Sequence, residues 1–305
     1  MAYAAKVLAD SISPDGARLT TMEVTFPRIV LAEFNTHRVF SRNSASSRAI
    51  PVEKMLKKVQ EDPFIPIYWG KNQKGMQAEH ELLPSEQSWA EAEWLEARDH
   101  AISSVQQMLA NGIHKQITNR LLEPWLWHTV IVTATEWDNF YALRCNPDAQ
   151  PEIRKVAEMM RAVHSASAPR AVNYGDWHLP LVDASEAFDI ISSGVPIADL
   201  CLVSVGRCAR VSYLTHDGKR DPLADVELAR RLQSSGHMSP FEHVATPLMP
   251  KDAIDIVYNQ IKSMVALPIT ANVKSVFSGN FRGWHQLRKR LADEDNFQRV
   301  LDARG

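Results

Sequence analysis

The sequence has few cysteines and no long apolar run. Its 305 residues include three cysteines, Cys145, Cys201 and Cys208, and none belongs to a CxxC pair. An odd number without that spacing argues against a disulfide framework and a zinc site, so we predict no metal centre. The N-terminus lacks a basic region followed by an apolar segment. We therefore expect a soluble, cytoplasmic protein with no membrane segment.

An excess of one charge is lacking too. Lys and Arg total 34 against 36 for Asp and Glu, which excludes a broad electrostatic attraction for nucleic acids or membranes. An anionic partner must therefore be bound by a local site. The motifs GxGxxG, Walker A and GxSxG are absent, so a nicotinamide-binding Rossmann domain, a P-loop and an α/β-hydrolase have no support.

Hydrophobic patterns predict both strands and helices along the chain. The stretch 165–198 is rich in Ser, Pro and Gly, and we interpret it as a linker-like segment between 1–164 and 199–305. Residues 200–213 fit a strand or the start of a helix. The other predicted elements are strands at 20–26 and 125–137, and helices at 84–111, 114–124, 151–164, 221–236 and 280–305.

A donor-rich segment, EFNTHRVFSRNSASSRAI, spans residues 33–50. Arginines, hydroxyls and backbone donors in such a loop can together bind a phosphate. A solvated loop with capping serines is the alternative, because serine-rich turns are common. The candidate phosphate ligands are His37, Arg38, Asn43, Ser46, Ser47 and Arg48.

Two later segments carry further candidates. Arg120, Asn139 and Arg144 lie around a buried strand and could form a second cationic site, although an arginine whose aliphatic stem packs on a helix is the simpler reading. GHMSPFEH contains two histidines beside an acid but no third metal ligand. Ser239 as a cap followed by proline explains most of that motif as a helix start.

The stretch HRVFSRNSASSR resembles the signature of flavin-dependent thymidylate synthases, in which Arg-His-Arg is followed by Ser and Arg. Thr36 replaces the first arginine, while His37, Arg38, Asn43, Ser46 and Arg48 match. The blocks NRLLEPWLWHTVIVTATEWDNFYALRCNPDAQPEI and RCARVSY…ARRLQSSGHMSPFEH also resemble this family. The second block normally precedes the signature, so we predict a circularly permuted relative.

This resemblance implies an α+β fold with helices packed on a mostly antiparallel sheet. It also implies that 1–164 and 199–305 form one catalytic fold, in a homotetramer whose active sites are shared between subunits. Family enzymes use reduced FAD and methylenetetrahydrofolate to convert dUMP to dTMP, with NADPH as the candidate reductant.

The resemblance assigns roles by position. The residues that it places at the flavin are His37, Arg38, Thr133, Asn139, His237 and Ser239. Those that it places at the nucleotide are Ser46, Ser47, Arg48, Arg120 and Ser212. Arg144, with Ser46, is the candidate catalytic residue, because a permanent cation at the pyrimidine edge stabilises negative charge on the ring.

Two departures from the signature concern the base. Ser44 stands where glutamate is usual, and Glu33 stands where glutamine is common. A carboxylate accepts from the amino group of cytosine, whereas uracil presents a carbonyl there, so Glu33 favours dCMP over dUMP. Hydroxymethylation of dUMP or dCMP is therefore an alternative function. A non-catalytic paralogue that binds a nucleotide or flavin is a second alternative.

Overall fold

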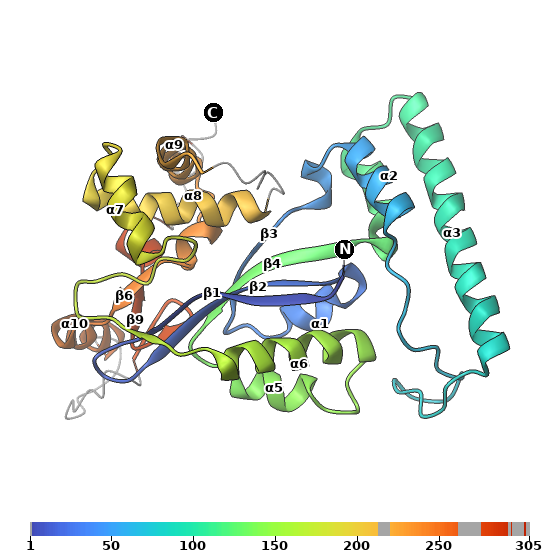
Figure 1. Ribbon diagram of the computed structural model, residues 1–305, viewed down its shortest axis with the longest axis horizontal. Coiled ribbons are helices and arrows are strands. Elements are labelled where there is room, and N and C mark those ends of the chain that lie inside the picture. The colour runs from blue at the N-terminus through green and yellow to red at the C-terminus, as the bar shows by residue number, and fades with distance from the viewer. Residues whose placement is uncertain (1, 213–219, 262–275, 292–293, 295–301, 303–305) are drawn as a thin grey trace.

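A five-stranded sheet lies at the centre of the computed structural model, which describes residues 2–212, 220–261, 276–291, 294 and 302 (Figure 1). The strand order is β3-β4-β2-β1-β5, and all neighbours are antiparallel except β1 and β5. The strands are β1 (Ala4–Ile12), β2 (Arg18–Pro27), β3 (Ser41–Ser44), β4 (Trp127–Ala134) and β5 (Arg170–Ala171). The predicted α+β fold with a mostly antiparallel sheet is confirmed.

Helices cover both faces of this sheet. Successive side chains of a strand point to opposite faces, and Met22, Val24 and Phe26 of β2 belong to the core beneath α6 (Pro151–Ala166). On the other face, Ile131 packs against Cys208 of α8 (Leu200–Ser212). The central strands are therefore buried on both sides.

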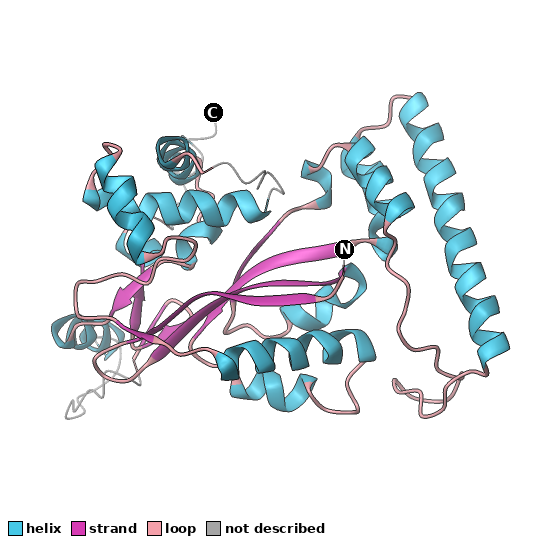
Figure 2. Cartoon of the chain, in the orientation of Figure 1, coloured by secondary structure: helices cyan, strands magenta, loops and turns pink. Residues whose placement is uncertain are grey.

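The other helices flank this central unit (Figure 2). Near one end of the sheet, α2, α3 and the turns after α3 share a core of their own. No helix in the described part of the chain is both long enough and apolar enough to cross a bilayer. The helices other than α6 and α8 are α1 (Leu31–Asn35), α2 (Val52–Glu61), α3 (Pro84–Ala110), α4 (Lys115–Thr118), α5 (Asp138–Arg144), α7 (Ala184–Ser192), α9 (Pro222–Ser234) and α10 (Pro250–Ile261).

Short elements complete the fold. Two small two-stranded sheets, β6-β9 and β7-β8, lie in the C-terminal part. Their strands are β6 (Ala245–Pro247), β7 (Phe277–Ser278), β8 (Phe281–Arg282) and β9 (Trp284–Gln286). The 3-10 turns are η1 (Arg28–Val30), η2 (Ser47–Ala49), η3 (Asn119–Trp125), η4 (Ile197–Asp199), η5 (Ser239–Glu242) and η7 (Leu287–Arg290).

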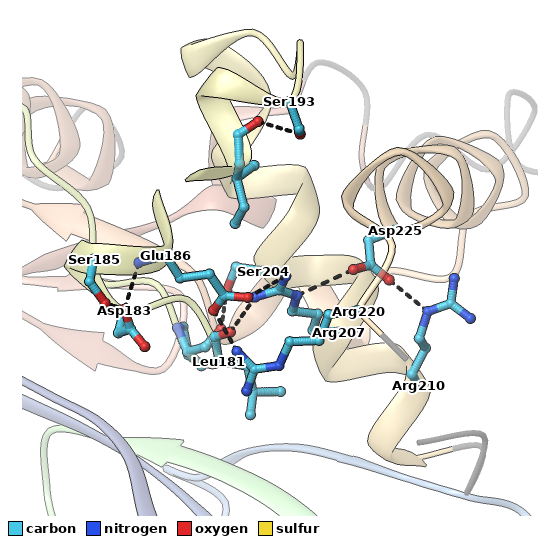
Figure 3. Close-up of polar contacts among 12 residues, drawn as sticks. Leu181, Asp183, Ser185, Glu186, Ser193, Ser204, Arg207, Arg210, Arg220 and Asp225 are labelled. Carbon is cyan, nitrogen blue, oxygen red and sulfur yellow. Dashed lines mark hydrogen bonds and ion pairs between the residues drawn. The ribbon is translucent and has the colours of Figure 1, made fainter. Parts of the chain in front are cut away.

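A charge network joins the C-terminal helices α7, α8 and α9 (Figure 3). Asp225, which is almost fully buried, accepts hydrogen bonds from Arg207 Nε at 3.2 Å and Arg210 Nε at 2.6 Å. Arg207 also pairs with Glu186 of α7 at 2.9 Å. Buried charges are retained in folded proteins when they are paired in this way. The network fixes α8, whose Cys208 carbonyl contacts the signature strand.

Several parts of the chain differ from the predicted elements. The donor-rich loop contains strand β3, and Met238 rather than Ser239 is the N-cap of η5. The predicted helix 280–305 is wrong at its start, where β8 and β9 bury Phe281 and Trp284, and much of the rest falls outside the described residues. Gly279 and Gly283 have φ values of 70° and 73°, which do not occur in a right-handed helix. The predicted helix 114–124 is a single α turn followed by η3. β1 was missed, because most of its residues are only partly buried and show little alternation.

The segment 165–198 contributes β5, α7 and a fully buried histidine, His178. The His178 amide donates to the carbonyl of Ala245 at 2.8 Å, and its ring Nε2 lies 2.8 Å from Thr21 Oγ1 of β2. This segment therefore packs against both the central sheet and the C-terminal part.

Candidate active site

Arg144 is the best fixed of the candidate site residues. It is the last residue of α5, and its Nε donates to His37 Nε2 at 3.0 Å. Its Nη2 donates to Thr36 Oγ1 at 3.1 Å and to the Glu33 carbonyl at 3.3 Å. The structure thus brings together Glu33, Thr36, His37 and Arg144, which we call the Arg144 cluster. A guanidinium held by three acceptors has a defined orientation.

His37 is buried in an aromatic environment. Its ring lies edge-on to Phe140, with centroids 4.9 Å apart, and tilted against Phe40 at 5.8 Å. Burial, with the positive charges of Arg144 and Arg42, lowers the pKa of His37 to about 4. The imidazole is therefore neutral at pH 7. Because Nε2 accepts from Arg144, the ring proton resides on Nδ1.

The turn that carries His37 is held by Arg42, which was not among the predicted site residues. Arg42 Nη1 donates to the carbonyls of Phe34 at 3.3 Å and His37 at 3.5 Å. Thr36, which stands in place of the family's first arginine, donates its hydroxyl to the Glu33 carbonyl at 2.6 Å. Glu33 Oε2 is buried without a hydrogen-bond partner among the described residues.

Ser47 and Arg120 meet at the other end of β3, around Glu123. Glu123 Oε1 accepts from Ser47 Oγ at 2.5 Å and Arg120 Nη1 at 2.7 Å, and pairs with Arg28 Nη2 at 3.0 Å. Burial opposes ionisation of Glu123, but the donors from Ser47, Arg28 and Arg120 outweigh it and lower the pKa of the carboxyl. We call these four residues the Glu123 cluster.

Arg48 lies beside this cluster with an exposed side chain, and Ser44 and Ser46 are partly exposed. Within the described part of the chain, these three side chains form no hydrogen bond or ion pair. No hydrogen bond or ion pair between described residues joins the Arg144 cluster to the Glu123 cluster either. Along the chain, Glu33, Thr36 and His37 precede β3 and Ser47 follows it, so β3 separates the two clusters in sequence, while Arg28 and Asn35 line one cavity with Arg120 and Glu123.

Between the two clusters, the signature strand contacts the C-terminal part. Asn43 Nδ2 donates to the Cys208 carbonyl at 3.2 Å, and Asn43 Oδ1 accepts from Ser239 Oγ at 3.0 Å. The block containing SPFEH therefore lies against the signature although some 200 residues separate them, as the predicted permutation requires. Ser212 is the last residue of α8.

Thr133 is placed differently from the other flavin candidates. It is fully buried in β4, where its Oγ1 lies 2.7 Å from Thr21 Oγ1 and 2.8 Å from His243 Nδ1. Burial lowers the pKa of His243 to about 3, so this imidazole is neutral. Arg38, Asn139 and His237, by contrast, are exposed.

Sequence reasoning missed Arg28, Arg42 and Glu123. Arg42 lies inside the quoted signature, so its position between His37 and Asn43 was a usable signal. Glu123 stands next to Pro124 in a segment already singled out for Arg120, and an acid three residues after an arginine is a typical helical pair. Arg28 had no such signal, because only the fold brings it to Glu123.

These features define an α+β protein whose signature strand separates an arginine-imidazole cluster from a second cationic cluster. A model of the family described as thymidylate synthase complementing protein matches residues 18–170, about half of the chain. The chain belongs to this family, the flavin-dependent thymidylate synthases. No curated protein sequence matches it.

Two solved structures are similar to the chain. Both are of the UMP/dUMP methylase PolB from Streptomyces cacaoi. The structure bound with 5-Br UMP has 16% sequence identity and a TM-score of 0.44, and the match covers 54% of this chain and 89% of that chain. For the structure bound with 5-Br dUMP, the identity is 16%, the TM-score 0.42, and the coverage 54% and 91%.

FAD is the cofactor of this family, and the residues present fit it. Arg38, Asn139 and His237 expose donors that no described side chain engages. Neutral His37 adds a ring N–H on Nδ1. Donors of this kind suit the phosphate and carbonyl oxygens of a flavin nucleotide.

Proposed function

We propose that this protein catalyses flavin-dependent one-carbon transfer from methylenetetrahydrofolate to C5 of a pyrimidine deoxynucleotide, with dUMP to dTMP as the first candidate reaction. The observation that carries the proposal is the Arg144 guanidinium, fixed by His37, Thr36 and the Glu33 carbonyl. A cation held against the pyrimidine edge stabilises negative charge on the ring and makes C5 a better nucleophile.

Bound FAD would supply the hydride that no protein side chain can provide, with NADPH as its reductant. His37, Arg38, Asn139, His237 and Ser239 would hold it. Thr133 would support the flavin site indirectly, because its hydroxyl is already hydrogen-bonded to two buried partners, Thr21 and His243.

Ser46 and Arg48 would bind the nucleotide phosphate, since both keep free donors. Ser47 and Arg120 would join them, although each now donates to Glu123. Arg120 is half-exposed and can turn toward a phosphate while Ser47 stays on the acid. Ser212, the last residue of α8, would be an additional contact to the nucleotide.

We further propose that each active site combines the Arg144 cluster of one subunit with Arg48 of another, in a homotetramer. The separation of the two clusters along β3 supports this arrangement.

Glu33 favours a second candidate, a reaction on dCMP. Its Oε2 is buried without a hydrogen-bond partner among the described residues, and its backbone carbonyl accepts from Arg144 Nη2. An unpaired buried acceptor is unfavourable, and the amino group of cytosine would satisfy it. The product would then carry a methyl or a hydroxymethyl group at C5.

Purified protein tests these proposals directly. It should take up FAD, and with a reductant and methylenetetrahydrofolate it should convert dUMP or dCMP to a product that mass spectrometry identifies. A methyl product supports the first candidate, and a hydroxymethyl product replaces it with the alternative. Protein that stays colourless with FAD and converts neither nucleotide would favour a non-catalytic paralogue.

A further inference from the structure

Gln286 of β9 joins the signature strand to the SPFEH turn. Its side chain is almost fully buried, and its Nε2 donates to Ser41 Oγ at 2.8 Å and to the Glu242 carbonyl at 3.3 Å. Ser41 is the first residue of β3, and Glu242 is the last residue of η5. One primary amide has two N–H groups, so these two bonds use both.

Neighbouring residues strengthen the same connection. Asn280 Nδ2 donates to Ser41 Oγ at 3.3 Å, and Arg288 Nη1 donates to Glu242 Oε1 at 2.5 Å. Gly279 allows this packing, because a Cβ at that position would lie 1.8 Å from Gln286 Oε1. We call residues 279–288 the C-terminal strap. It lies outside the range that the family model matches.

The position of Ser41 gives the strap its importance. Ser41 pairs with Thr133 of β4 and lies between His37 on one side and Ser46 on the other. Among the described residues, only Gln286 and Asn280 of the strap donate hydrogen bonds to Ser41 Oγ. The strap therefore sets where β3 begins, and with it the placement of both clusters.

We propose that Gln286 is a positioning residue, which acts through Ser41 to hold the signature strand in its binding geometry for FAD and nucleotide. The ligands in this proposal rest on the proposed function, whereas the contact between Gln286 and Ser41 does not. Removing the amide takes the Gln286 donor from the Glu242 carbonyl and leaves Ser41 Oγ with only the longer bond from Asn280, inside a buried region. The strand then loses order locally, while the main core of the sheet, which lies elsewhere, stays intact.

The test compares Gln286→Met and Asn280→Ala with Val105→Ala, which removes buried volume from the core under α3 and touches no strap residue. Val105→Ala controls for a loss of stability alone. FAD dissociation constants, kcat and KM for the nucleotide, and hydrogen exchange of the 37–46 peptide are measured for each.

Gln286→Met should weaken FAD binding about tenfold, because losing the two hydrogen bonds of the amide disturbs the strand that holds the cofactor without removing a direct contact to it. It should lower kcat more than it raises KM, and it should raise exchange in 37–46. Asn280→Ala should act in the same direction but less, because its bond is longer. Wild-type FAD affinity in both strap variants, or an equal loss in Val105→Ala, would overturn the proposal.

The exchange measurement separates this inference from the proposed function. If the wild-type protein binds no FAD, the proposed function fails. The strap is then judged on exchange alone. Faster exchange of 37–46 in Gln286→Met supports it, and unchanged exchange refutes it.

Discussion

The two ends of the signature strand differ in how far their cations are already occupied. At the first end, Arg144 has three protein acceptors and a buried neutral imidazole beside it. At the second end, Arg48 is exposed without a described partner, and Arg120 shares a carboxylate with Ser47. The first end is organised without a ligand, whereas at the second end Arg120 would have to leave Glu123 before it could contact a ligand. Under the proposed function, the first end would stabilise the reacting ring and the second would bind the phosphate.

The largest effect should come from Arg144→Ala. Removing a preorganised cation from the reacting ring should lower kcat by roughly 10²–10³-fold, because it stabilises charge only as the reaction proceeds. Steady-state kinetics with thermal melting as a fold check measures this. Arg231→Ala on the exposed side of α9 removes an equal charge and should leave kcat unchanged. A near-normal kcat for Arg144→Ala would remove its assigned role.

Arg48→Ala should act on binding rather than on turnover. Losing one charge-assisted contact to a phosphate should weaken nucleotide affinity roughly 10- to 100-fold, with kcat at saturation preserved. Calorimetric titration at two salt concentrations checks this. Arg120→Ala should have a smaller effect, because Glu123 already engages that guanidinium. Equal losses in kcat at both ends of β3 would abolish the distinction between them.

Glu33→Gln tests which base the first end accepts. The ratio of dCMP to dUMP affinity should fall about tenfold, because an amide can also donate to the carbonyl of uracil. Competition binding with the two nucleotides gives this ratio. A ratio unaltered by the substitution would show that Glu33 does not contact the base.

The smallest expected effect is a difference in pH dependence between the two ends. His37 at the first end and Glu123 at the second should lose their contributions to folding stability over different pH ranges. The pKa of His37 is lowered from 6.5 to about 4, so the unfolded chain binds a proton that the folded chain does not between those values. His37 therefore contributes stability that is lost as pH falls from about 6.5 toward 4. Glu123 has its pKa lowered from 4.5, so its contribution persists to lower pH and is lost below 4.5.

Urea unfolding of His37→Asn and Glu123→Gln against the wild type isolates these terms. The stability difference between the wild type and His37→Asn should shrink as the pH falls from about 6.5 toward 4. The stability difference between the wild type and Glu123→Gln should change only in the lower window, below pH 4.5. The buried His178 and His243 remain in all three proteins, so their titration cancels. Loss of the Glu123 charge lowers the pKa of His128 further, which acts only in the lower window. A Glu123→Gln difference that changes above pH 5 would contradict the assignment.

Much of the fold was predictable from local pattern. The β-branched run of β4 and the proline-started α6 have signals within a few residues, and both appear as predicted. The strands of the strap were not predictable, because their short apolar positions, Phe281 and Trp284, find their partners only through distant chain. Local periodicity cannot encode that pairing.

The site residues also divide into those that the sequence predicted and those that only the fold reveals. The family resemblance marked His37 and Ser46 in the signature, and Arg144 in a second block, as candidates. The partners that orient them, such as Arg42 and Gln286, become visible only when the strands are assembled. Glu123 shows a further limit, since its three donors come from three separate segments of the chain.

Subunit complementation tests most directly whether the two ends of β3 from different subunits build one active site. Arg144→Ala and Arg48→Ala proteins, each impaired, would be co-expressed with different tags, and the doubly tagged oligomers would be purified. The account predicts that these mixed oligomers recover part of the wild-type turnover, because some sites receive both intact arginines. Mixed oligomers no more active than either variant, or a protein that forms no oligomer, would contradict it.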